Sequence, residues 1–359
     1  MSFELGNKVK IQVTGASHAP KITVKLSGIS AGFAIDSFAV ETMLDRRAGG
    51  GAVYTTARKE ADRPNILAGI ADGITTGEDI EAEFINSNVR RQDYENLKFV
   101  PRPSHADYAA FMKYKGNIDL SGGGFFSGRM TLPVVFAGAV CRQILEEKGI
   151  LIGAHIASVG NINDDRYDPV EDCMEINADG LPVLNPVTGK KMEELMTRMS
   201  GEGDSIGGVI ECKITGLPVG LGEPIYDSVE SQLSYAMFGI PAVKGIEFGS
   251  GFDITKMQGS EANDSFSVRD GEVRTVTNHS GGIQGGITNG MPVVFRVAIK
   301  PTPSIYKTQK SFEMDTKVET DLTIKGRHDA CIVPRAVPCV EAMCAIVLLD
   351  LLSQSEVEV

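Results

Sequence analysis

The sequence predicts an α+β fold, because segments with the alternation of strands and segments with the spacing of helices follow one another along the chain. With 359 residues the chain is long enough to bury a large core. Its 42% hydrophobic and 23% charged residues are typical of a globular protein, not of a disordered chain or a coiled coil. Both halves repeat the order strand, helix, glycine-rich strand, which favours a pseudo-symmetric architecture.

The beginning of the chain is predicted to be rich in β-strands. Residues 8–14 (KVKIQVT) and 21–28 (KITVKLSG) alternate apolar and polar side chains, as half-buried strands do. Gly15, Gly28 and Gly32 separate these runs and indicate turns.

Two helices are predicted next. Residues 36–47 carry apolar residues at helical spacing, with Asp36 or Ser37 as the N-cap. Residues 132–149 are apolar enough to form a buried helix, which we expect to end at Gly149.

The second half opens with an irregular stretch. Residues 161–203 are rich in Asp, Asn, Pro and Gly, so we expect an insertion or long loop followed by a short helix. Beyond it the patterns predict strands over residues 207–218 and 291–301 and helices over residues 227–239 and 336–354. Asp227 or Ser228 is the expected N-cap of the first of these helices.

The net charge of −12 argues against a general nucleic-acid or membrane-surface binder, which needs a basic face. The charge is uneven, since residues 1–135 carry +1 and the remainder −13. Guanidinium groups suit bidentate recognition of carboxylates and phosphates, although any one of them can also be an ordinary solvated arginine. The arginines of this first part are Arg46, Arg47, Arg58, Arg63, Arg90, Arg91, Arg102 and Arg129.

Cysteine usage predicts a reducing compartment. The six cysteines form neither CxxC pairs nor a disulfide framework. The first residues (MSFELGNKVKIQ) contain no apolar signal segment, and the uninterrupted apolar runs are too short to span a membrane. We therefore expect a cytoplasmic protein. His328, Asp329 and Cys331 lie close together in sequence, but no second set has zinc spacing, so we expect no metal.

Two of the five histidines stand in Ser-His contexts, at His18 (TGASHAP) and His105 (PRPSHADY). Imidazole titrates near neutrality, so these residues are candidates for general acid or base work. A capping or loop role is the alternative. Arg102 and Asp107 flank His105, and this context favours a protonated imidazole that donates a proton.

Four loops rich in glycine or proline are candidate ligand contacts. Residues 120–131 (LSGGGFFSGRMT) lead into a predicted helix, where backbone N–H groups can hold phosphate. Residues 278–290 (NHSGGIQGGITNG) allow close backbone approach. Residues 300–305 (KPTPSI) could form a phosphate clip, and residues 201–208 (GEGDSIGG) could line a site. Tight turns and a proline-ended strand remain the alternatives.

Taken together, these stretches make the chain similar to the chorismate synthases over nearly its whole length. The motifs that carry the resemblance, in order, are TGASHAP, MLDRR, YTTARKE, ADGITTG, RRQDY, RPSHADY, GEGDSIGG, GLGEPIYD, AVKGIEFGSGF, GGIQGGITNG, KPTPSI and GRHDACIVPRAVPCVEAM.

The resemblance implies a single domain over residues 1–359, with helices packed between two antiparallel sheets, pseudo-two-fold internal symmetry and assembly as a homotetramer. It implies the last step of the shikimate pathway, in which 5-enolpyruvylshikimate 3-phosphate loses phosphate to give chorismate. Reduced FMN is required without net redox change. The arginines suit this substrate, because it carries two carboxylates and a phosphate.

The resemblance also assigns roles to residues. His18 matches the histidine that protonates the leaving phosphate, His105 the one beside the flavin pyrimidine edge, and Asp329 the carboxylate that assists proton transfer at flavin N5. His328 would orient its neighbours. The matching flavin contacts are Ser127, Ala242, Gly285, Lys300, Pro301, Thr302, Pro303, Ser304 and Arg327, and the matching substrate contacts are Arg46, Arg47, Arg129 and Ser17.

Several positions depart from the family pattern. Ala16 and Ala19 replace a glutamate and a glycine around His18, and Val53 replaces an arginine. Phe125 and Phe126 stand where the family has arginine and serine. These changes motivate an alternative hypothesis, a non-catalytic relative that binds an anion or a partner and holds flavin weakly. The change at Val53 also argues against an NADPH-dependent flavin reductase activity of its own.

Overall fold

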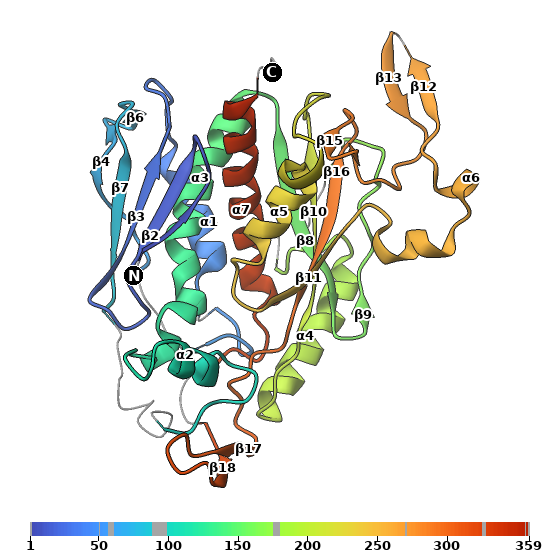
Figure 1. Cartoon of the computed structure of the whole chain (residues 1–359). Helices are drawn as coiled ribbons and strands as arrows, with labels where there is room; N and C mark the ends of the chain where they lie inside the picture. The colour runs from blue at the N-terminus through green and yellow to red at the C-terminus, as the bar shows by residue number, and fades with distance from the viewer. Residues whose placement is uncertain are drawn as a thin grey trace.

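The computed structural model describes residues 2–49, 51–56, 61–87, 99–174, 180–269, 271–324, 328–355 and 357. Helices form a central layer, and an antiparallel sheet lies on either side of it (Figure 1). The predicted α+β sandwich, with helices between two antiparallel sheets, is therefore confirmed. Its pseudo-two-fold symmetry stays a prediction.

The first sheet comes from the N-terminal part of the chain. Alternation decides which face is buried: in β3, Ile22, Val24 and Leu26 point into the core while the intervening residues are half-buried. The strand order is β1 (Ser2–Leu5), β2 (Lys10–Thr14), β3 (Lys21–Ser27), β7 (Ile80–Ile85) and β4 (Asn65–Ala68), with every neighbouring pair antiparallel.

The second sheet is formed by the later strands. Its order is β11 (Val243–Phe248), β16 (Val293–Ile299), β10 (Gly208–Thr215), β8 (Leu151–Val159) and β9 (Ile162–Asn163), again antiparallel throughout. The predicted strands over residues 207–218 and 291–301 correspond to β10 and β16, two central strands that are buried nearly throughout. They can be buried on both faces because the loop before α4 covers part of the outer face.

That outer face carries a row of ionisable side chains, which we call the ladder. It consists of His155, Glu211, Arg296 and Glu247, paired in register across β8, β10, β16 and β11. His155 Nε2 lies 3.0 Å from Glu211 Oε2, and Arg296 contacts Glu211 at 3.2 Å and Glu247 at 2.7 Å. The ion pairs of Arg296 with two carboxylates, and the contact of Glu211 with the His155 ring, compensate for the burial of these groups.

The helical layer contains α1 (Ser37–Arg47), α3 (Thr131–Glu147), α5 (Val229–Met237) and α7 (Val333–Gln354). Asp36 caps α1 and Ser228 caps α5 by accepting backbone N–H groups, as the sequence predicted. The helices α3 and α7 approach so closely that a Cβ at Gly138 would lie 2.3 Å from the Ala342 Cβ. Glycine at that position is therefore what permits the contact.

The helix α7 begins at Val333, three residues before the predicted start. It is long and apolar enough to cross a membrane, but 83% of its most apolar window is buried inside the protein. It is therefore the core helix of the sandwich.

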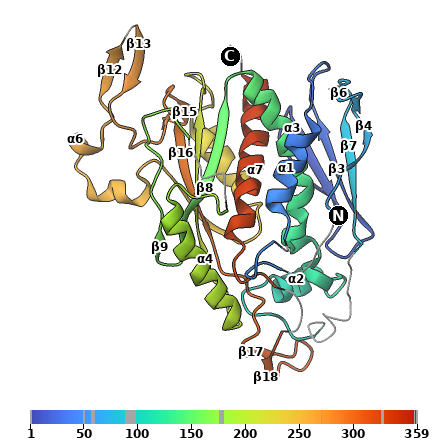
Figure 2. The ribbon, with the colours of Figure 1, turned by 180° about the vertical axis from the view of Figure 1, so that it is seen from behind.

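The remaining elements lie around this sandwich (Figures 1 and 2). The loop after β9 leads to α4 (Pro186–Gly201), which at 16 residues is longer than the short helix expected there. The other helices are α2 (Asp107–Lys113) and α6 (Gly259–Ala262), with 3-10 turns at Ser121–Phe126, Gly128–Met130, Ile225–Asp227 and Gly251–Lys256. The small hairpins are β5 (Ile70–Ala71) with β6 (Ile74–Thr75), β12 (Phe266–Arg269) with β13 (Glu272–Thr275), β14 (Ile283–Gln284) with β15 (Ile287–Thr288), and β17 (Gln309–Phe312) with β18 (Glu319–Leu322).

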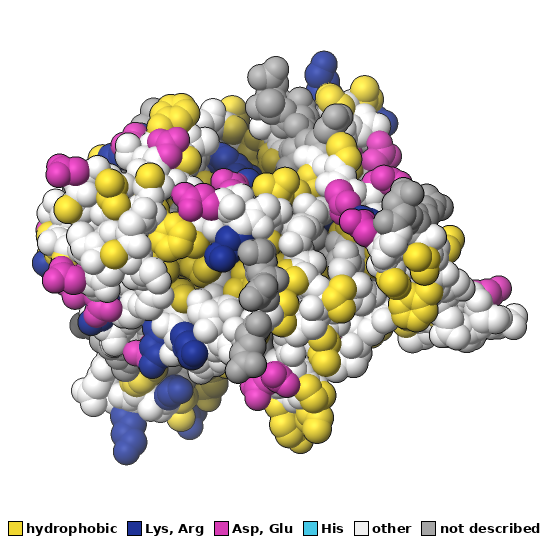
Figure 3. All heavy atoms as spheres, turned by 90° about the horizontal axis from the view of Figure 1, so that it is seen from above, with side chains coloured by type: hydrophobic (Ala, Val, Ile, Leu, Met, Phe, Trp, Pro, Cys, Tyr) yellow, Lys and Arg dark blue, Asp and Glu magenta, His cyan; other side chains and the backbone are white. Residues whose placement is uncertain are grey.

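Figure 3 shows the molecule from the end at which α7 finishes. Acidic and basic side chains lie scattered there among hydrophobic and uncharged ones, so no single sign of charge dominates this face.

Candidate active site

The two Ser-His histidines meet at the glycine triplet that precedes α3. His18 follows β2 and is 7% exposed, and the backbone N–H of its neighbour Ser17 donates to the Gly124 carbonyl at 3.0 Å. The His105 ring reaches the same turn from the loop before α2. Segments nearly a hundred residues apart are thereby brought to one end of the helical layer.

Glycine is required at this turn for two reasons. A Cβ at Gly122 would overlap the His18 ring, 1.9 Å from its Cε1, whereas a Cβ at Gly123 would make only an ordinary contact, 3.5 Å from the His105 Nε2. Both residues also have positive φ, +61° and +87°, which side chains disfavour. The turn is thus a backbone surface against which the two imidazoles pack.

His105 belongs to a buried triad with Arg102 and Asp107. Asp107 accepts three hydrogen bonds from Arg102, at 2.8 to 3.0 Å, and its Oδ1 lies 2.5 Å from the His105 Nδ1. When the His105 hydrogen is on Nδ1, it is donated to the Asp107 carboxylate. The other ring nitrogen, Nε2, then faces Gly123.

The charge of His105 differs from the sequence expectation. Burial lowers its pKa, and Arg102 and Lys300 lower it further, so that the opposing effect of Asp107 is outweighed. The predicted protonated imidazole was therefore wrong, because the sequence showed the carboxylate but not the burial. Burial would raise the pKa of Asp107, but the hydrogen bonds from Arg102 and His105 hold it well below its usual range.

Two arginines share one carboxylate beside the His18 loop. Asp62 accepts from the Arg47 Nη1 at 3.0 Å and from the Arg129 Nη1 at 2.8 Å. The Arg129 Nε donates to the Asn86 Oδ1, and the Asn86 amide donates to the Ala16 and Ala19 carbonyls on either side of His18. The arginine pair therefore helps to hold the loop that carries His18.

Positive charge is left over in this pair. Burial and the nearby Arg335 lower the pKa of Arg47 to about 10, at which it is still cationic at neutral pH. The Arg129 Nη2 is buried and has no hydrogen-bond partner within the part of the chain that the structure describes. A buried guanidinium donor of this kind can bind an oxygen of an anion.

Asp329 lies just before α7. Its Oδ1 accepts from the Thr56 backbone N–H at 2.9 Å, and the Arg335 Nη1 contacts Oδ1 and Oδ2 at 3.0 and 2.8 Å. Its backbone carbonyl accepts from the Thr302 hydroxyl at 2.9 Å. The carboxylate is therefore held from α7 and from the loop after α1.

The predicted clip, residues 300–304, joins these pieces. The Lys300 backbone N–H donates to the Ala242 carbonyl, and the Lys300 Nζ donates to the Ser104 carbonyl. The Ser304 hydroxyl accepts from the Arg102 Nη1 at 3.2 Å. Its contacts with Ala242, Asp329 and the residues around His105 place the clip within the same assembly.

We call this assembly of charged groups the site cluster. It contains the cations Arg47, Arg102, Arg129, Lys300 and Arg335 and the carboxylates Asp62, Asp107 and Asp329, beside the imidazoles of His18 and His105. Cations outnumber carboxylates, so the arrangement suits a small polyanion with proton-transfer groups at hand.

A family model described as chorismate synthase matches residues 9–353 of the chain. The chain belongs to the chorismate synthase family.

Individual relatives match over nearly their full lengths. The chorismate synthases of Lancefieldella parvula and Dehalococcoides mccartyi are each 43% identical, over 98% of this chain and 96% of the relative. A solved structure titled as the crystal structure of chorismate synthase covers 97% of this chain and 93% of its own, with a TM-score of 0.73 and 28% identity. The function is that of a chorismate synthase, a lyase of the shikimate pathway, and use of FMN is a property of the family.

The structure brings together most of the residues that the resemblance selected. The ones that lie in or beside the site cluster are Ser17, His18, Arg47, His105, Ser127, Arg129, Ala242, Lys300, Pro301, Thr302, Pro303, Ser304 and Asp329. Arg327 lies outside the described residues, as do Arg58, Arg90 and Arg91.

Two selected residues lie elsewhere. Arg46 forms a bidentate ion pair with Glu341, at 2.6 and 2.9 Å. Glu341 lies on α7, six residues after Arg335. Gly285 is in the turn of the β14–β15 hairpin. The seven residues of β16, roughly 20 Å of strand, separate this hairpin from Lys300.

Sequence reasoning missed several members of the assembly. Asp62, Asn86 and Arg335 support the predicted residues, but Asp62 and Asn86 lie outside the motifs that carry the resemblance. The one available signal was the placement of Arg335 within the GRHDACIVPRAVP motif.

The phenylalanines that depart from the family pattern belong to an aromatic cluster. The Phe125 ring centroid lies 5.5 Å from that of Phe3, 5.9 Å from that of Tyr114 and 4.9 Å from that of Phe126. Phe125 is therefore anchored against β1 and the end of α2.

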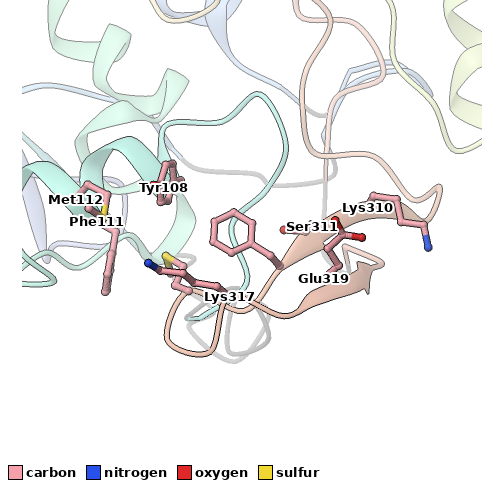
Figure 4. A pocket seen from close by; sticks show the side chains of 9 residues that line it. Tyr108, Phe111, Met112, Lys310, Ser311, Lys317 and Glu319 are labelled. Carbon is pink, nitrogen blue, oxygen red and sulfur yellow. The ribbon is translucent and has the colours of Figure 1, made fainter.

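A cavity of about 740 Å³ lies nearby, between α2 and the β17–β18 hairpin (Figure 4). His18, His105 and Asp329 do not line it. Its lining residues are Tyr108, Phe111, Met112, Lys310, Ser311, Phe312, Met314, Lys317 and Glu319. The edge-to-face contact of Tyr108 with Phe312, at 5.4 Å, joins the hairpin to α2.

Proposed function

We propose that the site cluster binds 5-enolpyruvylshikimate 3-phosphate and removes its phosphate and one ring hydrogen to give chorismate. The observation that carries this proposal is the position of His18. Its ring packs against Gly122, and the loop that carries it is held by Asn86, which in turn accepts a hydrogen bond from Arg129. An acid at that place can protonate a phosphate held by arginines, and this favours departure of the phosphate.

The remaining residues take complementary roles. Arg47, Arg129 and Ser17 bind the anionic groups of the substrate, because their donors lie around the His18 loop. Asp329 accepts the proton that leaves the ring. His105, neutral and fixed by Asp107, presents Nε2 as a hydrogen-bonding group without adding charge.

The same region fits the family cofactor, reduced FMN. The Arg129 Nη2, which has no partner among the described residues, offers a donor to an anion. The clip offers hydroxyl and ammonium groups on a backbone stiffened by Pro301 and Pro303. Ser127, Ala242, residues 300–304 and Arg327 would hold the cofactor. When bound, reduced FMN supplies electron density that eases C–O cleavage and is returned within the turnover.

Gly285 lies in the β14–β15 hairpin, beyond the other end of β16 from Lys300, and its assignment as a flavin contact stays a prediction. We infer that the protein is a homotetramer, as expected from the family, and that it works in the cytoplasm as a single-domain chain. The Val53 side chain, 76% exposed, adds no cation near Thr56, which supports a protein without its own NADPH-dependent flavin reductase activity.

The decisive experiment is an anaerobic assay of chorismate formation with excess chemically reduced FMN. Wild-type protein should turn over, and His18→Ala should lose nearly all activity. His279→Ala is the matched control, because His279 is hydrogen-bonded to Ser250 in another part of the fold. Folded wild-type protein that forms no chorismate at saturating flavin would support the non-catalytic alternative instead.

A further inference from the structure

Arg335 lies on the first turn of α7 and makes contacts to two other segments of the site. Its Nη1 lies 3.0 and 2.8 Å from the two Asp329 carboxylate oxygens, and its Nε donates to the Arg47 backbone carbonyl at 3.0 Å. The Arg335 side chain is 20% exposed and the Asp329 side chain 13%. One guanidinium thus connects the carboxylate to the end of α1.

We propose that Arg335 is a positioning residue that fixes the Asp329 carboxylate relative to the arginines of the site. This inference rests on the proposed function, in which Asp329 accepts the ring proton. It assigns Arg335 a role through Asp329, not through direct contact with the substrate.

The geometry requires a guanidinium. Nη1 reaches both oxygens of Asp329 while Nε, on the same rigid plane, reaches the Arg47 carbonyl. A lysine has one nitrogen and cannot hold both partners in that arrangement. The loop after α1 is shaped to this side chain, because a Cβ at Gly49 would lie 3.4 Å from the Arg335 Cζ and 2.8 Å from a Thr56 methyl.

The contacts of Arg335 also connect Asp329 with the loop that carries His18. Arg335 holds the backbone of Arg47, whose side chain pairs with Asp62; Asp62 pairs with Arg129. Through Asn86, Arg129 supports the loop of His18. The proposed proton donor and proton acceptor are therefore held by one continuous set of hydrogen bonds and ion pairs.

A general base that is misplaced by about 1 Å loses roughly 10²-fold in rate, whereas binding of distant groups is little affected. We therefore expect Arg335→Lys to lower kcat roughly 10²-fold while the KM for substrate changes little. With substrate deuterated at the carbon that loses hydrogen, the isotope effect on kcat should rise, because proton abstraction becomes slower. FMN binding, followed by flavin fluorescence in the absence of substrate, should be unchanged.

Arg335→Gln serves as a second variant if the lysine protein does not fold, since the amide can still donate one hydrogen bond. Arg142→Lys is the matched control: Arg142 is also partly buried and paired with a carboxylate, Glu341, but lies away from Asp329. It should keep the wild-type kcat and isotope effect.

Three results would overturn the inference: an unchanged kcat in Arg335→Lys, a loss of substrate or FMN binding equal to the loss of kcat, or an unchanged isotope effect in a slow variant. The variant Asp329→Asn distinguishes failure of the positioning role of Arg335 from failure of the proposed function of Asp329. If Asp329→Asn is inactive and Arg335→Lys is fully active, only the positioning role is wrong. If Asp329→Asn is fully active, the acceptor assignment itself is wrong.

Discussion

The site cluster and the ladder are both groups of buried charges, but they are built on opposite principles. In the ladder, Arg296 lies between the carboxylates of Glu211 and Glu247, and Glu211 also contacts the His155 ring, across four paired strands. In the site cluster, cations outnumber carboxylates, and the Arg129 Nη2 has no partner among the described residues. Buried groups that pair with one another stabilise the protein's own fold, whereas an excess of cations with an unpaired donor leaves binding capacity for an anion.

The ladder and the site cluster also differ in the elements that surround them. The ladder is covered by the protein itself: the Tyr167 N–H donates to Glu211 at 2.9 Å, and the Lys213 ammonium donates to the carbonyls of Asp168, Glu171 and Cys173. The site cluster is held by loops and helix ends instead. The comparison predicts that substitutions in the ladder change stability and substitutions in the site cluster change activity.

The largest effect is expected in the ladder. Glu211→Ala leaves His155 and Arg296 without their shared carboxylate, and loss of one partner of a buried ion pair costs about 3–5 kcal/mol. Chemical denaturation should show this loss in the free energy of unfolding, while kcat per folded molecule stays near that of the wild type. A large fall in kcat at unchanged stability would break the comparison.

Gly122→Ala tests the site cluster. The added methyl group would overlap the His18 ring, and the positive φ disfavours alanine. We expect kcat to fall roughly 10²-fold because the ring must move. Gly116→Ala is a suitable control, since it also has positive φ but its Cβ would meet only the Phe111 ring, at 3.4 Å. Equal kcat values for both variants would contradict the role given to His18.

Arg129→Lys should have an intermediate effect. Lysine keeps one positive charge but cannot contact Asp62, Asn86 and a ligand together. We expect the KM for substrate to rise about tenfold, which corresponds to about 1.4 kcal/mol, with a smaller change in kcat. Steady-state kinetics with saturating reduced FMN separates the two parameters.

The pH dependence of stability offers a finer test of the ladder. Burial would raise the pKa of Glu211, but His155, the Tyr167 N–H and Arg296 lower it overall. A lowered pKa contributes stability that is complete above the ordinary glutamate value of 4.5 and is lost as the pH falls through the lower folded value. Wild-type protein should therefore lose stability more steeply than Glu211→Gln below about pH 4.5, as measured by thermal unfolding.

The smallest effect is expected at an exposed ion pair outside both groups. Arg63 contacts Asp45 at 2.8 Å, and both side chains are largely accessible to solvent. Arg63→Ala should change the free energy of unfolding by about 0.5 kcal/mol or less, because water screens such pairs. A larger loss of unfolding free energy would mean that burial does not explain why substitutions in the ladder cost more stability than substitutions of exposed charges.

Arg46 and Arg47 show what a sequence motif can predict about a site and what it cannot. As neighbours in one motif they were assigned the same role, but successive residues of a helix point about 100° apart. Arg47 therefore enters the site cluster, while Arg46 pairs with Glu341. A motif identifies which residues matter together, but it does not show the direction of each side chain.

The sequence by itself determined four strands of the two sheets, the caps of α1 and α5, and the family, because alternation, capping and motif order are local properties of the chain. Only the tertiary structure decided the neutral state of His105, the sharing of Asp62 by two arginines and the contact of Arg335 with Asp329. These depend on burial and on distances between segments far apart in the chain, which no local pattern specifies.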